Sequence, residues 1–219
     1  MSSYSVKEIF LTVQGEGVRA GTVAVFLRFA GCNLWSGLEK DRAAAICKFC
    51  DTDFVKMDGV NGARYDTAES LAAKVKSLWR AQGEPWVVCT GGEPLLQLDD
   101  SLISALHDAG FKIAVETNGT LKAPKGIDWL CVSPKADAAL VQKTGDELKL
   151  VFPQLENHPS DFADLEFKYF CLQPRDDSYL DNYLGAEKKA THEQAAFEYC
   201  LDNPLWRLSV QTHKAINVP

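Results

Sequence analysis

The sequence contains no hydrophobic run that is long enough to cross a membrane. Its longest apolar runs, such as Val23-Ala24-Val25-Phe26-Leu27, fall far short of the roughly 20 residues that a transmembrane helix needs. The opening Met-Ser-Ser-Tyr-Ser-Val-Lys has neither the charged region nor the apolar region of a secretory signal. We therefore expect neither an integral membrane protein nor a secreted one.

Positive charge is also scarce. The chain has 23 Lys and Arg residues against 30 Asp and Glu residues, a net charge of −7, so it has no overall field that would attract a phosphate backbone. This disfavours a direct nucleic-acid partner. Because 46% of the residues are hydrophobic and 24% are charged, the composition is that of an ordinary globular protein and excludes a disordered one.

The seven cysteines do not form an even set for a disulfide framework. Without a secretory signal, reduced thiols in the cytoplasm are the better interpretation, with metal ligation, catalysis or core packing as their uses. The 219 residues predict a single domain over residues 1–219, since domains average roughly 150 residues.

Short apolar, β-branched runs predict strands, and several are separated by helical patterns. We expect helices at Asp66–Arg80, capped by Asp66, from Asp99 to a C-terminal glycine at Gly110, and at Lys189–Leu201. The expected strands are Val23–Phe29, Trp86–Cys89, Lys112–Val115, Trp129–Val132, Leu148–Phe152, Tyr169–Leu172 and Trp206–Val210.

Alternating strands and helices predict an α/β protein with a parallel sheet or barrel. A complete eight-stranded barrel takes about 250 residues, and the segment 33–46 uses part of this chain, so an incomplete (β/α) TIM-like barrel is expected. Polar stretches follow the strands, where such barrels collect their chemistry; generic polar loops are the alternative.

Cys32, Cys47 and Cys50 form the pattern C-x14-C-x2-C. Closed structural zinc sites have four ligands, and no histidine precedes His107, so zinc would have to recruit a distant group. A thioredoxin-like use of Cys47 and Cys50 leaves Cys32 without a role. An iron–sulfur cluster held by three cysteines keeps one iron open to a non-protein ligand. The cluster is favoured; zinc and unligated thiols stay open. Cys89, Cys131, Cys171 and Cys200 lie in apolar runs and are expected in the core.

The three cysteines, Phe49 before the last of them, and the turn Gly91-Gly92-Glu93-Pro94 resemble the radical S-adenosylmethionine superfamily, although its usual spacing is C-x3-C-x2-C. Over nearly the whole chain the sequence resembles the 7-carboxy-7-deazaguanine synthase family, some of whose members carry the same long insertion. The stretches that carry the resemblance are 8–10, 14–17, 28–35, 50–54, 89–94, 116–119, 133–135 and 211–214 with Asn217.

The resemblance implies a carbon–nitrogen lyase of 7-deazapurine (queuosine) biosynthesis, with an insertion at 33–46 in its cluster loop and a C-terminal tail at 212–219 closing the site. It implies that Cys32, Cys47 and Cys50 hold a 4Fe-4S cluster, that S-adenosylmethionine binds the open iron, and that Thr52 holds Mg²⁺. The implied S-adenosylmethionine-binding residues are Phe49, Asp51, Gly92, Ser133, Pro134, Lys135, Gln173, Pro174, Arg175 and Asp176. As isolated peptides most of these would be interpreted as turns.

The implied reaction contracts the ring of 6-carboxy-5,6,7,8-tetrahydropterin with loss of ammonia. Arg28 fits the substrate carboxylate through its fork of donors, and a structural ion pair is the alternative for this arginine in an apolar strand. Glu16 or the terminal carboxylate of Pro219 would accept the donors of the pterin edge. A frayed C-terminus is the alternative for Pro219. The implied substrate-binding set is Val13, Gln14, Gly15, Glu16, Arg28, Thr90, His213 and Pro219.

The resemblance further implies a homodimer, and the acidic chain is compatible with a flavodoxin-type reductant. An activase that makes a glycyl radical on a partner protein is the alternative enzyme, because such chains also use three cysteines and a Gly-Gly-Glu turn; it explains neither Arg28 nor the C-terminal tail. A zinc-binding interaction module is the alternative outside enzymes.

Overall fold

The computed structural model describes residues 3–176 and 187–218. Nine strands of the described residues form one open sheet in the order β3-β1-β2-β4-β5-β6-β7-β8-β9. The strands are β1 (Tyr4–Val13), β2 (Val23–Phe29), β3 (Ala63–Tyr65), β4 (Trp86–Gly91), β5 (Lys112–Thr117), β6 (Trp129–Val132), β7 (Thr144–Phe152), β8 (Glu166–Pro174) and β9 (Trp206–Leu208).

Every neighbouring pair from β2 to β9 is parallel, whereas β1 pairs antiparallel with both β2 and β3. The edge strands β3 and β9 do not pair with each other, so the sheet curves without closing. This confirms the incomplete TIM-like barrel, and it adds an antiparallel edge that the sequence did not predict.

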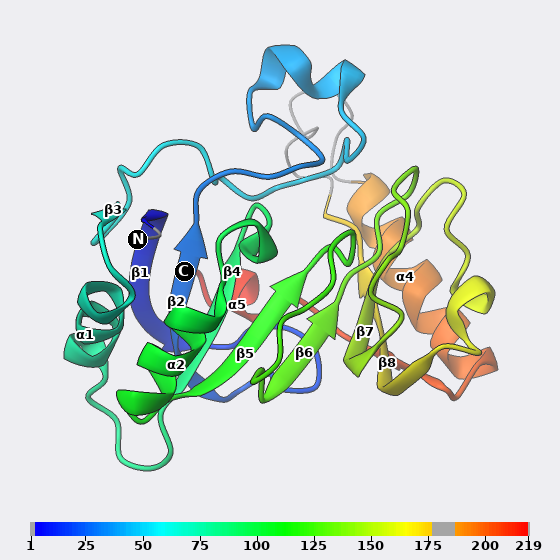
Figure 1. Cartoon of the computed structure of the whole chain (residues 1–219). Helices are drawn as coiled ribbons and strands as arrows, with labels where there is room; N and C mark the ends of the chain where they lie inside the picture. The colour runs from blue at the N-terminus through cyan, green and yellow to red at the C-terminus, as the bar shows by residue number, and fades with distance from the viewer. Residues whose placement is uncertain (1–2, 177–186, 219) are drawn as a thin grey trace.

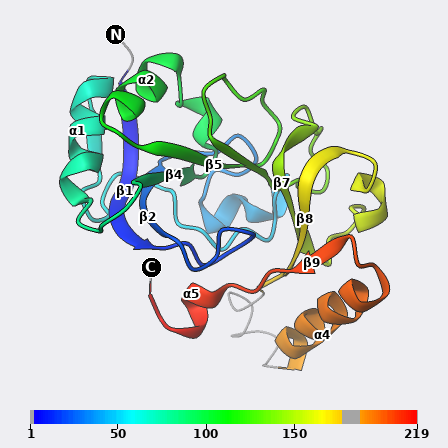
Figure 2. The same ribbon diagram turned by 90° about the horizontal axis from the view of Figure 1, so that it is seen from below.

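Helices α1 (Ala68–Leu78), α2 (Asp100–Asp108) and α4 (Glu187–Asp202) pack on the outer face of the sheet, and α5 (Thr212–Ala215) lies near the C-terminus (Figures 1 and 2). Helix α1 begins one residue later than expected for an Asp66 cap. Thr67 is its N-cap instead, with its side chain accepting a hydrogen bond from Ser70 N. Asp99 caps α2 and Gly110 follows it with a positive φ of 94°, both as predicted.

The main core lies between the sheet and the helices. Leu71 and Val75 of α1 and Leu102 and Leu106 of α2 are fully buried there against the outward side chains of the strands. The inner face of the sheet carries a smaller apolar cluster around Val88 and, along β7 and β8, buried polar side chains. No helix of the described residues is long and apolar enough to span a membrane.

Strands β1 and β3 were not predicted. The run of β1 is interrupted by Lys7 and Glu8, where the register with β2 shifts between Val6 and Glu8. This irregularity lets both Lys7 and Glu8 line the same cavity. Strand β3 has only three residues, none of them fully buried, so it carries no hydrophobic signal.

The open side of the barrel is joined by backbone and side-chain contacts rather than by a strand pair. Thr212 N donates to Gly15 O at 3.0 Å, and Gly17 N donates to Ser209 Oγ at 2.8 Å. Segment 209–213 is therefore attached to the β1–β2 connection, and α5 lies beside the inner face of the sheet (Figure 2).

The insertion at 33–46 folds onto the cluster loop and contains a short 3₁₀ helix, η1 (Glu39–Ala44). Arg42 stacks over the Trp35 ring, 4.1 Å from its centroid, and donates to Lys48 O at 3.0 Å and Cys50 O at 3.1 Å. The insertion thus holds the backbone of the Cys47–Cys50 segment.

Candidate active site

Two adjoining cavities lie at the carboxyl ends of the parallel strands. The larger has a volume of about 390 Å³ and the smaller of about 180 Å³. Six residues line both and so form their shared wall: Glu16, Asp51, Thr52, Thr90, Glu116 and Gln211. The pair is suited to hold two ligands whose reacting atoms meet at that wall.

The structure brings most of the predicted substrate-binding residues to the larger cavity. Its lining contains Val13, Gln14, Gly15, Glu16, Arg28, Thr90 and His213. Pro219 lies outside the described residues. Proximity gives these side chains access to one ligand; their individual roles stay predictions.

The smaller cavity collects the residues that were predicted to bind S-adenosylmethionine. Its lining contains Phe49, Asp51, Gly92, Ser133, Lys135, Gln173, Pro174, Arg175 and Asp176, together with Cys47, Cys50 and Thr52. Pro134 and Cys32 are not among its lining residues. Gln173 is buried, and its Oε1 has no hydrogen-bond partner among the described residues.

Of the three predicted cluster ligands, Cys32 lies shortly after the end of β2, and Cys47 and Cys50 lie in the loop between η1 and β3. Burial raises the pKa of the Cys32 thiol, and raises that of Cys50 to about 11; Cys47 lies close enough to add to both shifts. Within residues 3–176 and 187–218, no three His, Cys, Asp or Glu side chains converge as a cage for a single metal ion. Cluster thiolates bind separate irons, so a cluster does not require the three sulfurs to converge on one point.

The turn after β4 lies directly against Cys32. A Cβ at Gly92 would stand 2.1 Å from Gly31 O and 2.7 Å from Cys32 Cβ, so no side chain fits there. Glu93 is fully buried and accepts hydrogen bonds from Thr117 Oγ1 at 2.7 Å and Asn118 N at 2.8 Å. Glu93 therefore fixes the glycine turn to the end of β5.

A buried lysine, which the sequence did not predict, holds two carboxylates at the shared wall. Lys149 Nζ donates to Glu16 Oε2 at 2.6 Å and to Glu116 Oε2 at 2.8 Å. Burial by itself would raise the pKa of Glu16, but Lys149 and the Gln211 amide lower it to about 2. Glu16 Oε1 also accepts hydrogen bonds from Gln211 at 2.8 Å and Gln173 at 3.3 Å. A hydrogen-bond donor of a ligand would therefore bind a carboxylate that already accepts hydrogen bonds from the protein.

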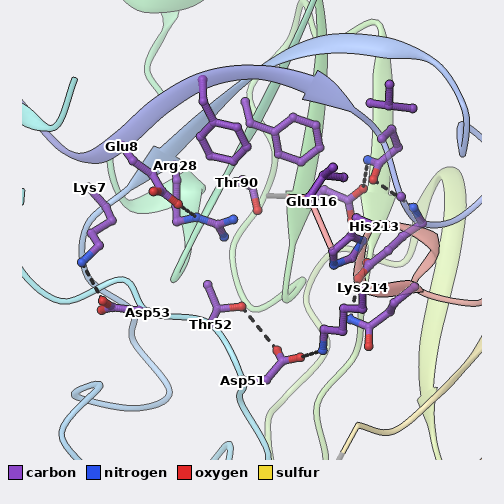
Figure 3. Close-up of a pocket in the computed structure, with 18 residues that line it drawn as sticks. Lys7, Glu8, Arg28, Asp51, Thr52, Asp53, Thr90, Glu116, His213 and Lys214 are labelled. Carbon is purple, nitrogen blue, oxygen red and sulfur yellow. Dashed lines mark hydrogen bonds and ion pairs between the residues drawn. The ribbon is translucent and has the colours of Figure 1, made fainter. Parts of the chain in front are cut away.

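Arg28 points into the larger cavity from β2 (Figure 3). Its Nε donates to Glu8 Oε1 at 2.8 Å, and its two terminal nitrogens have no partner among the described residues. Glu8, another residue that the sequence analysis missed, thus orients the guanidinium and leaves its outer fork for an anionic ligand.

Thr52 lies between two aspartates that are each held by a lysine (Figure 3). Asp51 Oδ2 accepts from Lys214 of α5 at 2.5 Å, and Asp53 Oδ2 accepts from Lys7 of β1 at 2.7 Å. The Thr52 hydroxyl makes one long contact of 3.5 Å with Asp51 Oδ1, so its oxygen stays accessible to a ligand in either cavity.

Cys89, Cys131 and Cys171 are buried, as expected, whereas Cys200 is only partly buried. The surroundings of two of them are not wholly apolar, because Cys131 lies beside Glu116 and Cys171 beside Glu147 on the inner face of the sheet. Glu147 is itself buried, accepts from Val18 N at 3.2 Å, and has no partner for Oε1 among the described residues. Burial raises the pKa of Glu147, and neighbouring Glu116 adds to the shift.

The chain is similar to several curated proteins over its whole length. It is 60% identical to the 7-carboxy-7-deazaguanine synthase of Caulobacter vibrioides and 54% identical to that of Burkholderia multivorans, in both cases over 99% of this chain and 100% of the relative. No protein-family model matches the chain. Among solved structures, QueE from Escherichia coli superposes with a TM-score of 0.67 at 24% identity, covering 95% of this chain and 94% of that one. This structural likeness concerns the fold.

Proposed function

The chain belongs to the 7-carboxy-7-deazaguanine synthase family, and we propose that it converts 6-carboxy-5,6,7,8-tetrahydropterin into 7-carboxy-7-deazaguanine and ammonia as a radical S-adenosylmethionine, Mg²⁺-dependent lyase. The observation that carries the proposal is the pair of adjoining cavities with Thr52, Thr90 and Glu116 in their shared wall. A reaction between a bound cofactor and a bound substrate needs this juxtaposition.

In this proposal the smaller cavity holds the cofactor. Cys32, Cys47 and Cys50 would ligate a 4Fe-4S cluster, and the side-chain-free turn at Gly92 would let S-adenosylmethionine approach the open iron. When bound, this group supplies the one-electron chemistry that removes a hydrogen atom from the substrate. Lys135, Gln173 and Asp176 line the same space and would contact the nucleoside part.

The larger cavity would bind the pterin. The outer fork of Arg28 would pair with its carboxylate, while Glu16 and His213 would face its ring. The Thr52 hydroxyl would be the protein ligand of Mg²⁺, which prefers oxygen and takes further ligands from substrate and water. Phe10 and Phe26 stack at 5.7 Å between ring centroids and line this cavity, where they would help to exclude water from the bound substrate.

The proposed reaction is balanced without an external oxidant. The tetrahydropterin has the atoms of the product plus one ammonia molecule, so the hydrogen taken from the substrate can return within each turnover. The proposal therefore makes S-adenosylmethionine a reusable cofactor. A reducing partner, for which a flavodoxin is suited, is needed to activate the cluster, and a homodimer is proposed from the family.

The test is to incubate anaerobically purified, reduced protein with S-adenosylmethionine, Mg²⁺ and the carboxytetrahydropterin, with iron and sulfide analysis alongside. We expect stoichiometric iron and sulfide, deazaguanine product and ammonia. Stoichiometric zinc without sulfide would contradict the radical chemistry. An intact cluster without product would favour the glycyl-radical activase.

A further inference from the structure

The loop that carries Thr52 is held from both sides by lysines that come from opposite ends of the chain. Lys7 lies on β1 and Lys214 on α5, and the aspartates that they bind immediately precede and follow Thr52. Figure 3 shows the two lysines approaching the loop from different directions, with the Thr52 hydroxyl between them.

Lys7 uses all three of its donors on this loop. It donates to Asp53 Oδ2 at 2.7 Å, Val55 O at 3.1 Å and Asp58 Oδ1 at 2.7 Å, while its own side chain is only 8% exposed. The other oxygen of Asp53 accepts from Val55 N at 3.0 Å. Both oxygens of this carboxylate are therefore engaged, one by Lys7 of β1 and the other by the backbone of the loop.

Lys214 joins the loop to the cofactor side of the site. Its Nζ contacts Asp51 Oδ2 and Asp176 Oδ2, both at 2.5 Å, and both aspartates line the smaller cavity. Asp176 has only 7% of its side chain exposed. The ammonium group thus lies between two carboxylates next to Thr52, where a divalent cation could otherwise bridge them.

Carboxylates are stronger ligands for hard divalent cations than a neutral hydroxyl. If Asp51 were unpaired, it would compete with Thr52 and draw the cation toward the cofactor cavity. An ammonium ion on Asp51 prevents this by occupying the carboxylate and by repelling a second cation at short range.

We propose that Lys214, supported by Lys7, is a positioning residue that withholds the two flanking aspartates from the divalent cation and so restricts its protein ligand at this loop to the Thr52 hydroxyl. The inference rests on the proposed function, which places Mg²⁺ at Thr52. With both aspartates withheld, the loop binds the cation weakly until a substrate supplies further oxygen ligands.

The test measures Mn²⁺ binding, by the loss of the free-ion magnetic resonance signal, to cluster-loaded protein without substrate. Mn²⁺ shares the oxygen preference of Mg²⁺. Lys214→Met keeps most of the apolar stem and removes the charge, and we expect it to bind Mn²⁺ at least about tenfold more tightly than the parent protein. Lys214→Arg keeps the charge and should bind as weakly as the parent. A merely structural role for Lys214 would not produce a gain in affinity.

The double variant Lys214→Met/Asp51→Asn tests whether the gain in Mn²⁺ affinity comes from Asp51. We expect it to bind Mn²⁺ as weakly as the parent protein. Lys168→Met, which breaks an exposed pair with Asp146, is the matched control and should change nothing. Unchanged Mn²⁺ affinity in Lys214→Met would overturn the inference, as would weaker binding in Asp51→Asn alone. These binding measurements need no substrate and are therefore independent of the product assay. Failure of the product assay would contradict the proposed function, whereas failure of the binding measurements would contradict only the role of Lys214.

Discussion

Lys149 determines the electrostatics of the wall between the two cavities. It is buried, and although burial by itself would lower the pKa of its ammonium group, Glu116 and Glu16 hold it above the ordinary value. The Lys149 ammonium group holds both carboxylate side chains at the wall through its two hydrogen bonds. The geometry of the proposed site thus depends on a buried lysine in the lining of the smaller cavity.

Glu16 should make the stability of the protein acid-sensitive. Its folded pKa of about 2 lies below the ordinary value of 4.5, so its contribution is present above pH 4.5 and is lost as the pH falls toward 2. A shift of this size corresponds to about 3 kcal/mol at most. Urea denaturation should show that Glu16→Gln destabilises the protein at about pH 6 and that this gap narrows toward about pH 3. A gap that does not change with pH would contradict the ion pair.

Glu147 should have the opposite effect. Since its pKa is raised by burial, the folded protein holds a proton that the unfolded chain releases, and stability falls as the pH rises above 4.5. Glu147→Gln keeps an acceptor for Val18 N and removes the ionisable group. We expect the variant to gain roughly 1 kcal/mol at about pH 8 relative to wild type, and less at about pH 5. Denaturation curves at the two pH values measure the difference, and equal curves would contradict it.

Single residues also show where sequence reasoning succeeded. The smaller cavity is lined by three predicted residues near strand ends, Thr90, Ser133 and Gln173, because the carboxyl ends of parallel strands lie at the same rim of the sheet. Lys149 and Glu147 were missed because β7 was interpreted as an apolar run. Glu147 and Lys149 alternate with Leu148 and Leu150, and this period of two residues predicts a strand with one polar and one apolar face.

The secondary-structure elements differ in how closely their bounds were predicted: β7 and β8 begin four and three residues earlier than predicted, and β9 ends two residues earlier. Strands β2 and β6 have the predicted bounds, and α2 begins and ends at its predicted caps. Strand β1 was missed because its pairing depends on β2 and β3 and is interrupted at Lys7. The shape of the insertion was also not predictable, since it rests on the stacking of Arg42 on Trp35.

The cap of α2 should matter more than the cap of α1. Asp99 Oδ1 accepts from both Leu102 N at 2.9 Å and the hydroxyl of the buried Tyr4 at 2.8 Å. Asp99→Ala removes the cap and leaves a buried hydroxyl unpaired, so we expect a loss of about 2–4 kcal/mol. Thr67→Ala removes a cap on an exposed turn and should cost about 1 kcal/mol. Thermal denaturation compares the two; equal losses would contradict the role of Tyr4.

At the scale of the whole molecule, the nine described strands form an open sheet, and segment 209–213 is attached to the β1–β2 connection across the open side. Local sequence patterns do not predict this attachment, because it joins residues almost two hundred positions apart. It explains why the larger cavity is lined by residues from both ends of the chain.

Gly15→Ala should loosen this attachment. A Cβ at Gly15 would stand 2.1 Å from His213 Nδ1, so His213 and its helix must move. We expect a several-fold higher KM for the pterin and faster hydrogen exchange over residues 209–215, with little change in iron content. Gly21→Ala is the control on the same connection, since nothing lies within 4 Å of its Cβ and only its positive φ is strained. Equal effects of the two variants would show that the contact between Gly15 and His213 does not maintain the attachment.

The most direct test of the central claim, that a cofactor and a pterin react across the wall shared by the two cavities, follows one hydrogen atom. Carboxytetrahydropterin carrying deuterium at C6 is turned over by the reduced enzyme, and the deuterium content of S-adenosylmethionine is measured by mass spectrometry. The account predicts deuterium in recovered S-adenosylmethionine together with 7-carboxy-7-deazaguanine and ammonia. Product formed without any transfer of deuterium would contradict it.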